Sequence, residues 1–240
     1  MSDAVIEEIA ATGTLRVGIN LGNMLLVTDR ATDGTPIGVA PDMANALGQK
    51  LGIPVQLVPF PKVGQVADAI SGPDLDIGLI AWEPERATTI AFSDPYVEIE
   101  ATYLVAPNAA FNSIEEVDRP GVEIAVADRA AYDLYLKRTL QHAKLVRGPG
   151  LDGAFELFKS KGLPVLAGLR PALQDNAQDL PGSKVLSGQY TSIQQAIGIK
   201  PGKPAASAFL NKFIAEAKAS GLVAEMLRRH GVSKKLTLAP

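Results

Sequence analysis

Residues 74–96 read DLDIGLIAWEPERATTIAFSDPY, and this stretch decides the fold that we expect. It begins with the short apolar run 77–82, which is typical of a buried strand. A turn through residues 83–85, Glu-Pro-Glu, then leads to Arg86. Ligands of α/β sheets bind outside the carboxyl ends of the strands, and a planar guanidinium suits a carboxylate. On spacing alone, Arg86 is either a carboxylate ligand or an ordinary surface arginine in a turn.

The composition is that of a globular protein with a core. The chain has 240 residues, of which 47% are hydrophobic and 20% are charged, so it holds one large domain or two small ones. A net charge of −3 offers no basic surface for nucleic acid or anionic lipid. The absence of cysteine excludes disulfides, thiolate catalysis and cysteine zinc sites. We expect no cofactor, no bound metal, no nucleic-acid partner, no membrane insertion and a monomer.

Strand and helix patterns alternate along the first half of the chain. Asp33-Gly34 predicts a hairpin between residues 25–28 and 37–39. The alternation predicts a parallel sheet covered by helices, with the loops after Ile19, Val58 and Ala81 along one edge. The expected strands are 15–19, 55–58 and 77–82, and the expected helices are 4–11, 41–51 and 63–70.

A second block repeats this alternation. Ser113 and Glu116 have the spacing of a capping box, which marks a helix start. The expected strands are 103–106, 124–127, 144–146, 165–169, 184–186 and 193–199, and the expected helices are 131–143, 151–161, 170–177, 204–220 and a last one around 223–227. Two similar blocks joined by two strand-like segments predict two lobes, although one large sheet fits the alternation equally.

Five motifs resemble the extracellular solute-binding proteins, family 3, that serve polar amino-acid ABC transporters. They are Gly13-x-Leu15-Arg-Val-Gly18, Gly38-Val-Ala-Pro-Asp42, Asp74-x-x-Ile77, Pro84-Glu85-Arg86 and Phe92-Ser-Asp-Pro-Tyr96. The resemblance implies an α/β, type II periplasmic-binding-protein fold, whose two lobes each hold a mixed, mostly parallel sheet flanked by helices. Two hinge strands would join lobe 1, residues 1–106 and 195–240, to lobe 2, residues 107–194, and the lobes would close on a small ligand.

The resemblance also implies a permease partner and a periplasmic location. Residues 1–10 read MSDAVIEEIA and show neither the basic region nor the apolar region of a secretory signal. A cytoplasmic location, or a sensory receptor without a transport role, therefore stays an alternative.

The resemblance assigns the carboxylate site residue by residue. Arg86 matches the carboxylate-binding arginine of the family. Leu79 matches a position that offers its backbone N–H, and Ala81 matches one that usually carries a serine or threonine hydroxyl. In lobe 2, a glycine–threonine turn matches Arg129-Ala130, after which a helix start would present backbone N–H groups to an anion.

The positions that usually hold the ligand's ammonium group are not acidic here. The acid after the first strand matches Asn20. The aspartate of lobe 2 matches Gly168, or Leu169 if the register slips by one, and Arg170 follows. Glu98 or Glu100, on the strand leading to the hinge, would replace the missing acids if either faced the cleft.

Other candidate ligand residues are less specific. Two positions that commonly stack on the ligand match Lys62 and Asn23. Polar or aromatic side chains near the expected hinge or rim complete the set: Gln194, Gln195, Trp82 and Tyr132. The simpler interpretation is that Lys62, Arg129 and Arg170 are solvated and that the aromatic residues belong to the core or the rim.

These departures predict the class of ligand. An α-amino acid would bury its ammonium group without a partner, which costs several kcal/mol. We therefore expect a small organic anion, such as a keto, hydroxy or dicarboxylic acid. The alternative is an enzyme resembling the cyclohexadienyl dehydratases, which needs a placed proton donor. We expect His142 and His230 to be solvated, so binding without catalysis is the favoured hypothesis.

Overall fold

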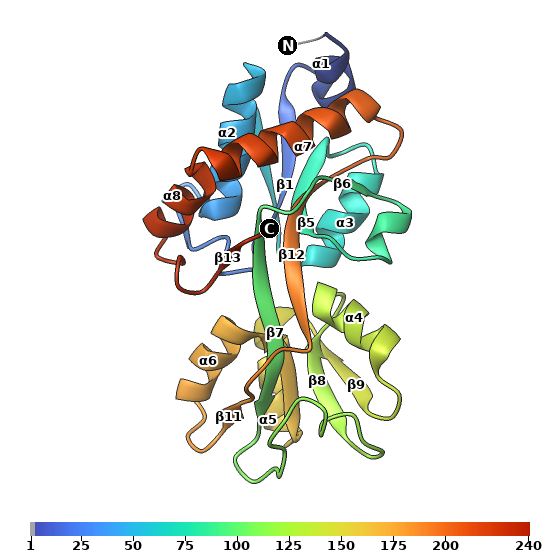
Figure 1. The fold of residues 1–240 in the computed structure, drawn as a ribbon, viewed down its shortest axis with the longest axis vertical. Coiled ribbons are helices and arrows are strands. Elements are labelled where there is room, and N and C mark those ends of the chain that lie inside the picture. Colours follow the sequence, from blue (N-terminus) through green and yellow to red (C-terminus); the bar gives the residue numbers. More distant parts are fainter. Residues whose placement is uncertain (1–2) are drawn as a thin grey trace. The chain divides into compact units, whose positions relative to one another are not determined.

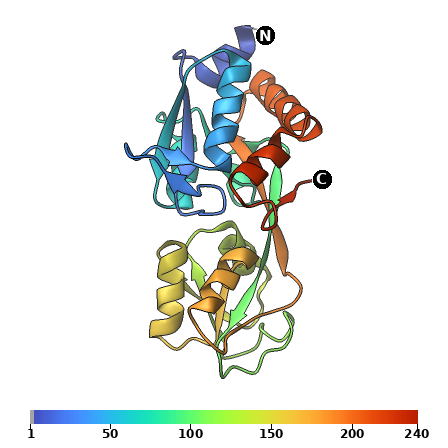
Figure 2. The same cartoon turned by 90° about the vertical axis from the view of Figure 1, so that its left-hand side faces the viewer.

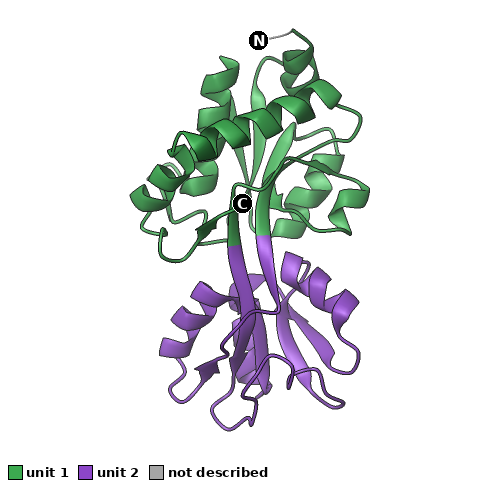
Figure 3. Ribbon diagram, in the orientation of Figure 1, with its two compact units in different colours: residues 1–98, 194–240 green, residues 99–193 purple. Residues whose placement is uncertain are grey.

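The structure is a computed structural model that describes residues 3–240 (Figure 1). It contains two compact units (Figure 3). Unit 1 holds the chain up to Glu98 and from Gln194 onward, and unit 2 holds Ile99–Ile193. The chain passes between them within strands β7 (Val97–Val105) and β12 (Thr191–Ile199).

The first crossing lies inside β7, whereas the sequence analysis placed it at the end of that strand. Strand pairing gives the reason. Val97 and Glu98 pair with β13 (Thr237–Leu238) of unit 1, while residues 101–105 pair with β10 (Val165–Leu169) of unit 2. A single strand therefore contributes to the sheets of both units.

The sheet of unit 1 has the strand order β4-β1-β5-β12. Strands β1 (Leu15–Asn20), β4 (Val55–Phe60) and β5 (Ile77–Ala81) run parallel, and β12 runs antiparallel to β5. The short strand β6 (Ala91–Phe92) pairs with the other side of β12. The parallel core of the predicted sheet is confirmed, and the loops after β1, β4 and β5 leave from one edge.

Six helical segments surround this sheet. They are α1 (Asp3–Ala10), α2 (Val39–Leu51), α3 (Val63–Ser71), the 3₁₀ turn η1 (Arg86–Thr88), α7 (Pro204–Ala219) and α8 (Leu222–Arg229). Helix α8 packs against α2 and α7, as Figure 2 shows. The apolar face of α3, predicted from its spacing, packs on Ile80 of β5 together with Leu75 and Ile90. This packing is close, because a Cβ at Gly78 would lie 2.6 Å from Ile70 Cδ1.

The predicted hairpin exists, but its strands were wrongly placed. Strands β2 (Asp29–Arg30) and β3 (Pro36–Ile37) form it, whereas residues 25–27 are buried in turns. The carbonyl of Asn23 accepts the N–H groups of both Leu26 and Val27, which coils this segment. Residues 25–27 are apolar because the turn is buried, and this apolar run resembles the pattern of a strand.

The sheet of unit 2 has the order β7-β10-β8-β9. Strands β8 (Glu123–Ala127), β9 (Lys144–Gly148) and β10 are parallel, while β10 and β11 (Lys184–Val185) run antiparallel to β7. Helix α5 (Gly150–Ser160) covers β8, β9 and β10, and the other two helices are α4 (Ala131–Thr139) and α6 (Arg170–Gln178).

Two predicted helix boundaries in unit 2 are wrong. No helix follows Ser113; instead, Glu116 Oε2 accepts the N–H of Asn112 at 2.7 Å within a loop. Helix α4 ends at Thr139 rather than near residue 143. The reason is Asp118, whose carboxylate accepts the N–H groups of residues 141, 142 and 143, each at 2.8 Å.

The Asp118 contact predicts a pH-dependent contribution to stability. Burial raises the pKa of Asp118, but the three backbone N–H groups and His142 outweigh burial and hold the pKa below its ordinary value. A carboxyl group with a lowered folded-state pKa stabilises the protein above its unfolded-state pKa, and that stabilisation disappears as the pH falls through the folded-state pKa. Asp118→Asn should therefore lower the melting temperature at about pH 7 and have much less effect at about pH 2–3.

Differential scanning calorimetry at the two pH values checks this expectation. Asp179→Asn, an exposed aspartate of the same unit, is the matched control and should change little at either pH. An equal loss for Asp118→Asn at both pH values would contradict the role of the charge.

Candidate carboxylate-binding site

Arg86 begins η1, one turn beyond the end of β5 at Ala81, and it is only 6% exposed. Its Nη1 donates to the carbonyl oxygen of Ala81 at 2.8 Å. The N–H of the same peptide group, that of Trp82, donates to the carbonyl of Gln194 in β12 at 2.8 Å. The guanidinium is thus fixed at the carboxyl end of β5 by the peptide between residues 81 and 82.

The turn before Arg86 is held by Glu83, which is 3% exposed. Its Oε2 accepts the N–H of Glu85 at 2.7 Å, and its carbonyl accepts the N–H of Ala87 at 2.9 Å. The sequence predicted Glu83 only as one residue of the turn that leads to Arg86. The available signal was the Glu-Pro-Glu sequence. An acidic side chain directly before a proline can accept the N–H two residues further on and so close a turn.

The other predicted residues of β5 are part of the sheet. Leu79 and Ala81 are 2% and 4% exposed, and they pair with Ile197 and Gln195 of β12. Neither side chain carries a polar atom. Any contact that they make with a ligand therefore has to come from the backbone.

The loop after β1 uses its polar side chains internally. Asn20 Oδ1 accepts the N–H of Gly22 at 3.1 Å, and Asn23 Oδ1 accepts the N–H of Leu25 at 3.2 Å. Met24 follows Asn23 directly and is 68% exposed, whereas the next three residues are buried. The exposed apolar side chain of the loop is therefore Met24 rather than a residue at the predicted stacking position 23.

Lys62 lies at the start of α3 and is exposed. Its backbone N–H donates to Gln65 Oε1 at 3.2 Å. The structure therefore agrees with the simpler interpretation of a solvent-facing lysine as well as with a ligand-facing one.

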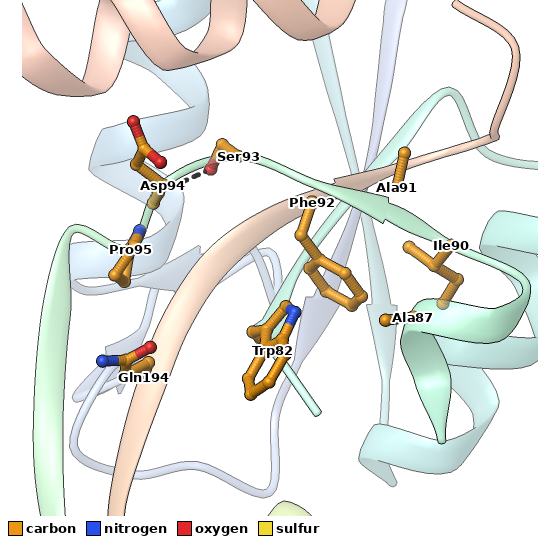
Figure 4. Close-up of a pocket in the computed structure, with 9 residues that line it drawn as sticks. All are labelled: Trp82, Ala87, Ile90, Ala91, Phe92, Ser93, Asp94, Pro95 and Gln194. Carbon is orange, nitrogen blue, oxygen red and sulfur yellow. Dashed lines mark hydrogen bonds between the residues drawn. The ribbon is translucent and has the colours of Figure 1, made fainter. Parts of the chain in front are cut away.

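A hollow of ≈ 460 Å³ lies beside the end of β5 in unit 1 (Figure 4). Trp82, Phe92, Ile90 and Ala87 form one part of its wall, and Gln194 lies on the opposite side below Pro95. Gln194 is half-buried, whereas its neighbour in β12, residue 195, is buried. Of the two predicted glutamines, the structure brings Gln194 to the hollow.

The turn that precedes α4 in unit 2 is left-handed. Arg129 has φ 57°, and it is the only non-glycine residue with positive φ between residues 3 and 240. Its N–H donates to Asp133 Oδ2 at 2.9 Å. The Asp133 carboxylate, itself buried, also lies 2.9 Å from Arg147 Nη2. Ala130 follows as a buried residue at the helix start.

Asp133 is a residue that the sequence analysis missed. Its position in the first turn of α4 was the available signal, because acidic side chains at helix starts accept free N–H groups. The carboxylate and Arg147 together hold a conformation that costs a non-glycine residue about 1–2 kcal/mol.

Gly168 and Arg170 stand where the resemblance implied an acid. A Cβ at Gly168 would lie 2.9 Å from Leu173 Cδ2, so a larger side chain there requires Leu173 to move. The guanidinium of Arg170 binds the Glu100 carboxylate, the carbonyl of Leu186 at 3.1 Å and the carbonyl of Gly188. Glu100 and Arg170 are therefore paired with each other within unit 2, and their contact with a ligand stays a prediction.

Tyr132 belongs to the core of unit 2 and is 3% exposed. Burial, with a smaller effect from Asp133, raises the pKa of its phenol well above the ordinary value for tyrosine. Three other tyrosines form an aromatic cluster in the same unit: the ring centroid of Tyr190 lies 4.6 Å from that of Tyr103 and 6.0 Å from that of Tyr135. Tyr132 thus fits the core interpretation better than a place on the rim.

The expectation that both histidines are solvated is wrong for one of them. His230 has a side chain that is 9% exposed, and its Nε2 lies 2.8 Å from Asp42 Oδ2. Its Nδ1 lies 3.4 Å from Thr28 Oγ1. Packing of α8 against α2 brings this histidine to a partner that is distant in the sequence. His142 is exposed.

Two α/β units, two strands shared between them and an arginine after the central strand of unit 1 are the features that the sequence predicted for a solute-binding protein. Residues 15–233 match the bacterial extracellular solute-binding proteins, family 3, and the chain belongs to this family. Among residues 3–240, no helix has both the length and the apolar character that crossing a membrane requires.

The most informative relatives are binding proteins and one enzyme. Cyclohexadienyl dehydratase of Pseudomonas aeruginosa is 27% identical over 147 residues, which cover 60% of this chain and 54% of that protein. The chain thus spans about half the length of this relative. An ancestral amino acid-binding protein, described as a precursor of cyclohexadienyl dehydratase, is 25% identical with a TM-score of 0.77, over 93% of this chain and 97% of that one.

Two further structures share the fold at lower identity. The solute receptor for L-cysteine of Neisseria gonorrhoeae is 18% identical, with a TM-score of 0.80 over 100% of both chains. An amino acid ABC transporter substrate-binding protein of Streptococcus pneumoniae, bound to L-arginine, is 18% identical, with a TM-score of 0.78 over 96% of this chain and 99% of that one. These likenesses confirm the predicted mixed α/β, type II periplasmic-binding-protein fold.

The left-handed turn makes a specific prediction for stability. Asp133→Ala should lower the free energy of unfolding by about 1–3 kcal/mol, because it leaves the Arg129 N–H and Arg147 without this carboxylate. The loss should be smaller in an Arg129→Gly background, since glycine adopts the left-handed conformation without steric cost. Urea unfolding of the four proteins of this double-mutant cycle measures the difference.

Asp152→Ala provides the control, because Asp152 occupies the first turn of the neighbouring helix α5 and is exposed. Equal losses for Asp133→Ala in the two backgrounds would show that Asp133 does not act through the conformation of residue 129.

Proposed function

We propose that the protein is the solute-binding component of an ABC-type uptake system and that it binds a small organic acid at Arg86. The observation that carries the proposal is a buried guanidinium fixed by the Ala81 carbonyl at the carboxyl end of β5. Family membership supports the binding role and a site of action outside the cytoplasm, and the transporter-associated relatives support a permease partner.

A carboxylate is the ligand group that this anchor suits best. A guanidinium offers several N–H donors in one plane, and Arg86 uses Nη1 for the Ala81 carbonyl. The turn held by Glu83 limits the movement of the arginine, so its geometry is set before the ligand arrives.

Three of the positions expected to meet an ammonium group are either not acidic or engaged. Asn20 Oδ1 accepts the N–H of Gly22, and no acid fits at Gly168 without moving Leu173. The Glu100 carboxylate is bound by Arg170. An α-amino acid would therefore bury a poorly compensated charge, and a keto, hydroxy or dicarboxylic acid would not.

We also propose that unit 2 takes part in binding the ligand. The family resemblance predicts that N–H groups at the start of α4 bind the same anion and that the two lobes close on it. The N–H groups of Arg129 and Ala130 are themselves bonded, to Asp133 Oδ2 and to the Ala127 carbonyl, so the helix start is the proposed donor. Small-angle X-ray scattering with and without succinate tests closure, since closure predicts a smaller radius of gyration.

Arg86→Ala should weaken the binding of succinate by about tenfold or more, because it removes a charge-assisted contact of about 1.5–3 kcal/mol. Arg86→Lys should recover only part of the affinity, since lysine keeps the charge but loses the planar fork. Isothermal titration calorimetry measures both. Arg30→Ala, at an exposed arginine of β2, is the matched control. Unchanged affinity in Arg86→Ala would place the carboxylate elsewhere.

The ligand class can be tested with a matched pair of molecules. Lactate and alanine differ only in carrying a hydroxyl or an ammonium group on the second carbon. The wild-type protein should bind lactate at least about tenfold more tightly, a difference of about 1.4 kcal/mol. The same calorimetric panel should include pyruvate, succinate and lysine. Micromolar affinity for a neutral or basic amino acid would overturn the proposed ligand class and leave the Arg86 anchor standing.

A dehydratase-like reaction is the second candidate function, and the match to cyclohexadienyl dehydratase is what favours it. Such chemistry needs a placed proton donor. Glu83 accepts the Glu85 N–H and Glu100 pairs with Arg170, so neither is presented as a general acid in this arrangement. Turnover of prephenate or arogenate by the purified protein would establish the enzyme, and its absence would leave the binding role.

A further inference from the structure

The hollow beside Trp82 has features of a second ligand site (Figure 4). Trp82 is the only tryptophan of the chain and is 43% exposed. An indole left this accessible keeps a large apolar surface in water, which folding alone disfavours. Phe92 and Ile90 also line the hollow and continue its apolar wall (Figure 4).

The hollow is separate from the carboxylate anchor. The two polar groups of a trans peptide point in opposite directions. In the peptide between Ala81 and Trp82, the carbonyl accepts from the Arg86 guanidinium and the N–H donates to the carbonyl of Gln194. Gln194 lines the hollow, while Arg86 is on the other side of this peptide and does not line it.

The charges of the wall favour a neutral occupant. Among the described residues, no lysine, arginine or histidine lines the hollow, so an anion finds no positively charged partner there. Asp94 is the one charged residue of the wall, and Figure 4 shows its carboxylate pointing away from Trp82. A cation over the indole would therefore lack a nearby carboxylate.

The size and the polar groups of the hollow further limit the class of ligand that it can bind. A volume of ≈ 460 Å³ lies within the range of small-molecule sites, about 300–1,000 Å³. The carboxamide of Gln194, on the side opposite Trp82, offers both a donor and an acceptor. We propose that this hollow binds a neutral small molecule with one aromatic ring, which stacks on Trp82 and Phe92 and places a polar group at Gln194.

Benzamide is a suitable probe, because it combines one ring with a neutral amide. Trp82 reports its binding directly, since all tryptophan fluorescence of this chain comes from the proposed site. The emission should change with benzamide along a saturable curve. Benzoate, benzylammonium and acetamide should each bind at least about tenfold more weakly, since they carry a charge or lack the ring. A change that stays linear in benzamide concentration would overturn the proposal.

Variants followed by ligand-detected NMR test the same site without the fluorophore. Trp82→Ala should weaken benzamide binding by about tenfold, while Trp82→Phe, which keeps a ring, should retain most of it. Met24→Ala removes an exposed apolar side chain from another loop and serves as the control. Melting temperatures establish that each variant is folded. Equal benzamide affinity in folded Trp82→Ala and wild type would overturn the proposal.

A competition experiment separates this inference from the proposed function. Saturating succinate should leave the affinity for benzamide unchanged, because the two ligands bind on opposite sides of one peptide. Displacement of benzamide by succinate would overturn the assignment of a separate site. If none of succinate, lactate and pyruvate binds, the function proposed for Arg86 fails while the benzamide titration still decides the second site.

Discussion

The peptide group between Ala81 and Trp82 carries the interaction on which the site of unit 1 depends. It ends the buried central strand β5, and it is bonded by Arg86 on one side and by the chain of β12 on the other. A buried guanidinium is costly unless its donors are satisfied. The Ala81 carbonyl satisfies one of them, and the turn closed by Glu83 keeps the arginine in place. The position of this guanidinium is therefore set by the end of the sheet and by the turn that Glu83 closes.

Unit 2 uses its charged residues in a different way. Arg147 is held by Asp133, and Arg170 is held by Glu100 and by two carbonyl groups. Arg129 and Arg170 were both predicted as candidate site residues from the sequence, with a solvated role as the simpler interpretation. With Arg170 engaged inside its own unit, the case for an organic acid rests on the absence of an acidic partner for an ammonium group. At one of the positions expected to supply that partner, a Cβ on residue 168 would lie 2.9 Å from Leu173 Cδ2, so an acid there would require the Leu173 side chain to shift.

Much of the fold could be predicted from local patterns. Strand β10 has the predicted bounds, and α3 packs the predicted face, because period and burial agree in both segments. The errors occurred where distant residues decide the local structure. The end of α4 depends on Asp118, and the burial of His230 depends on Asp42 of another helix. No window of sequence contains both partners.

The candidate site shows the same division. The place of Arg86 after an apolar strand was visible in the sequence, whereas the internal bonds of Asn20 and Asn23 depend on the path of their loop. The central claim is that Arg86 binds the ligand's carboxylate, and a crystal structure with saturating succinate tests it most directly. The account predicts a carboxylate oxygen within about 2.7–3.2 Å of a guanidinium nitrogen of Arg86. Succinate bound in the crystal with neither carboxylate at Arg86 would contradict it.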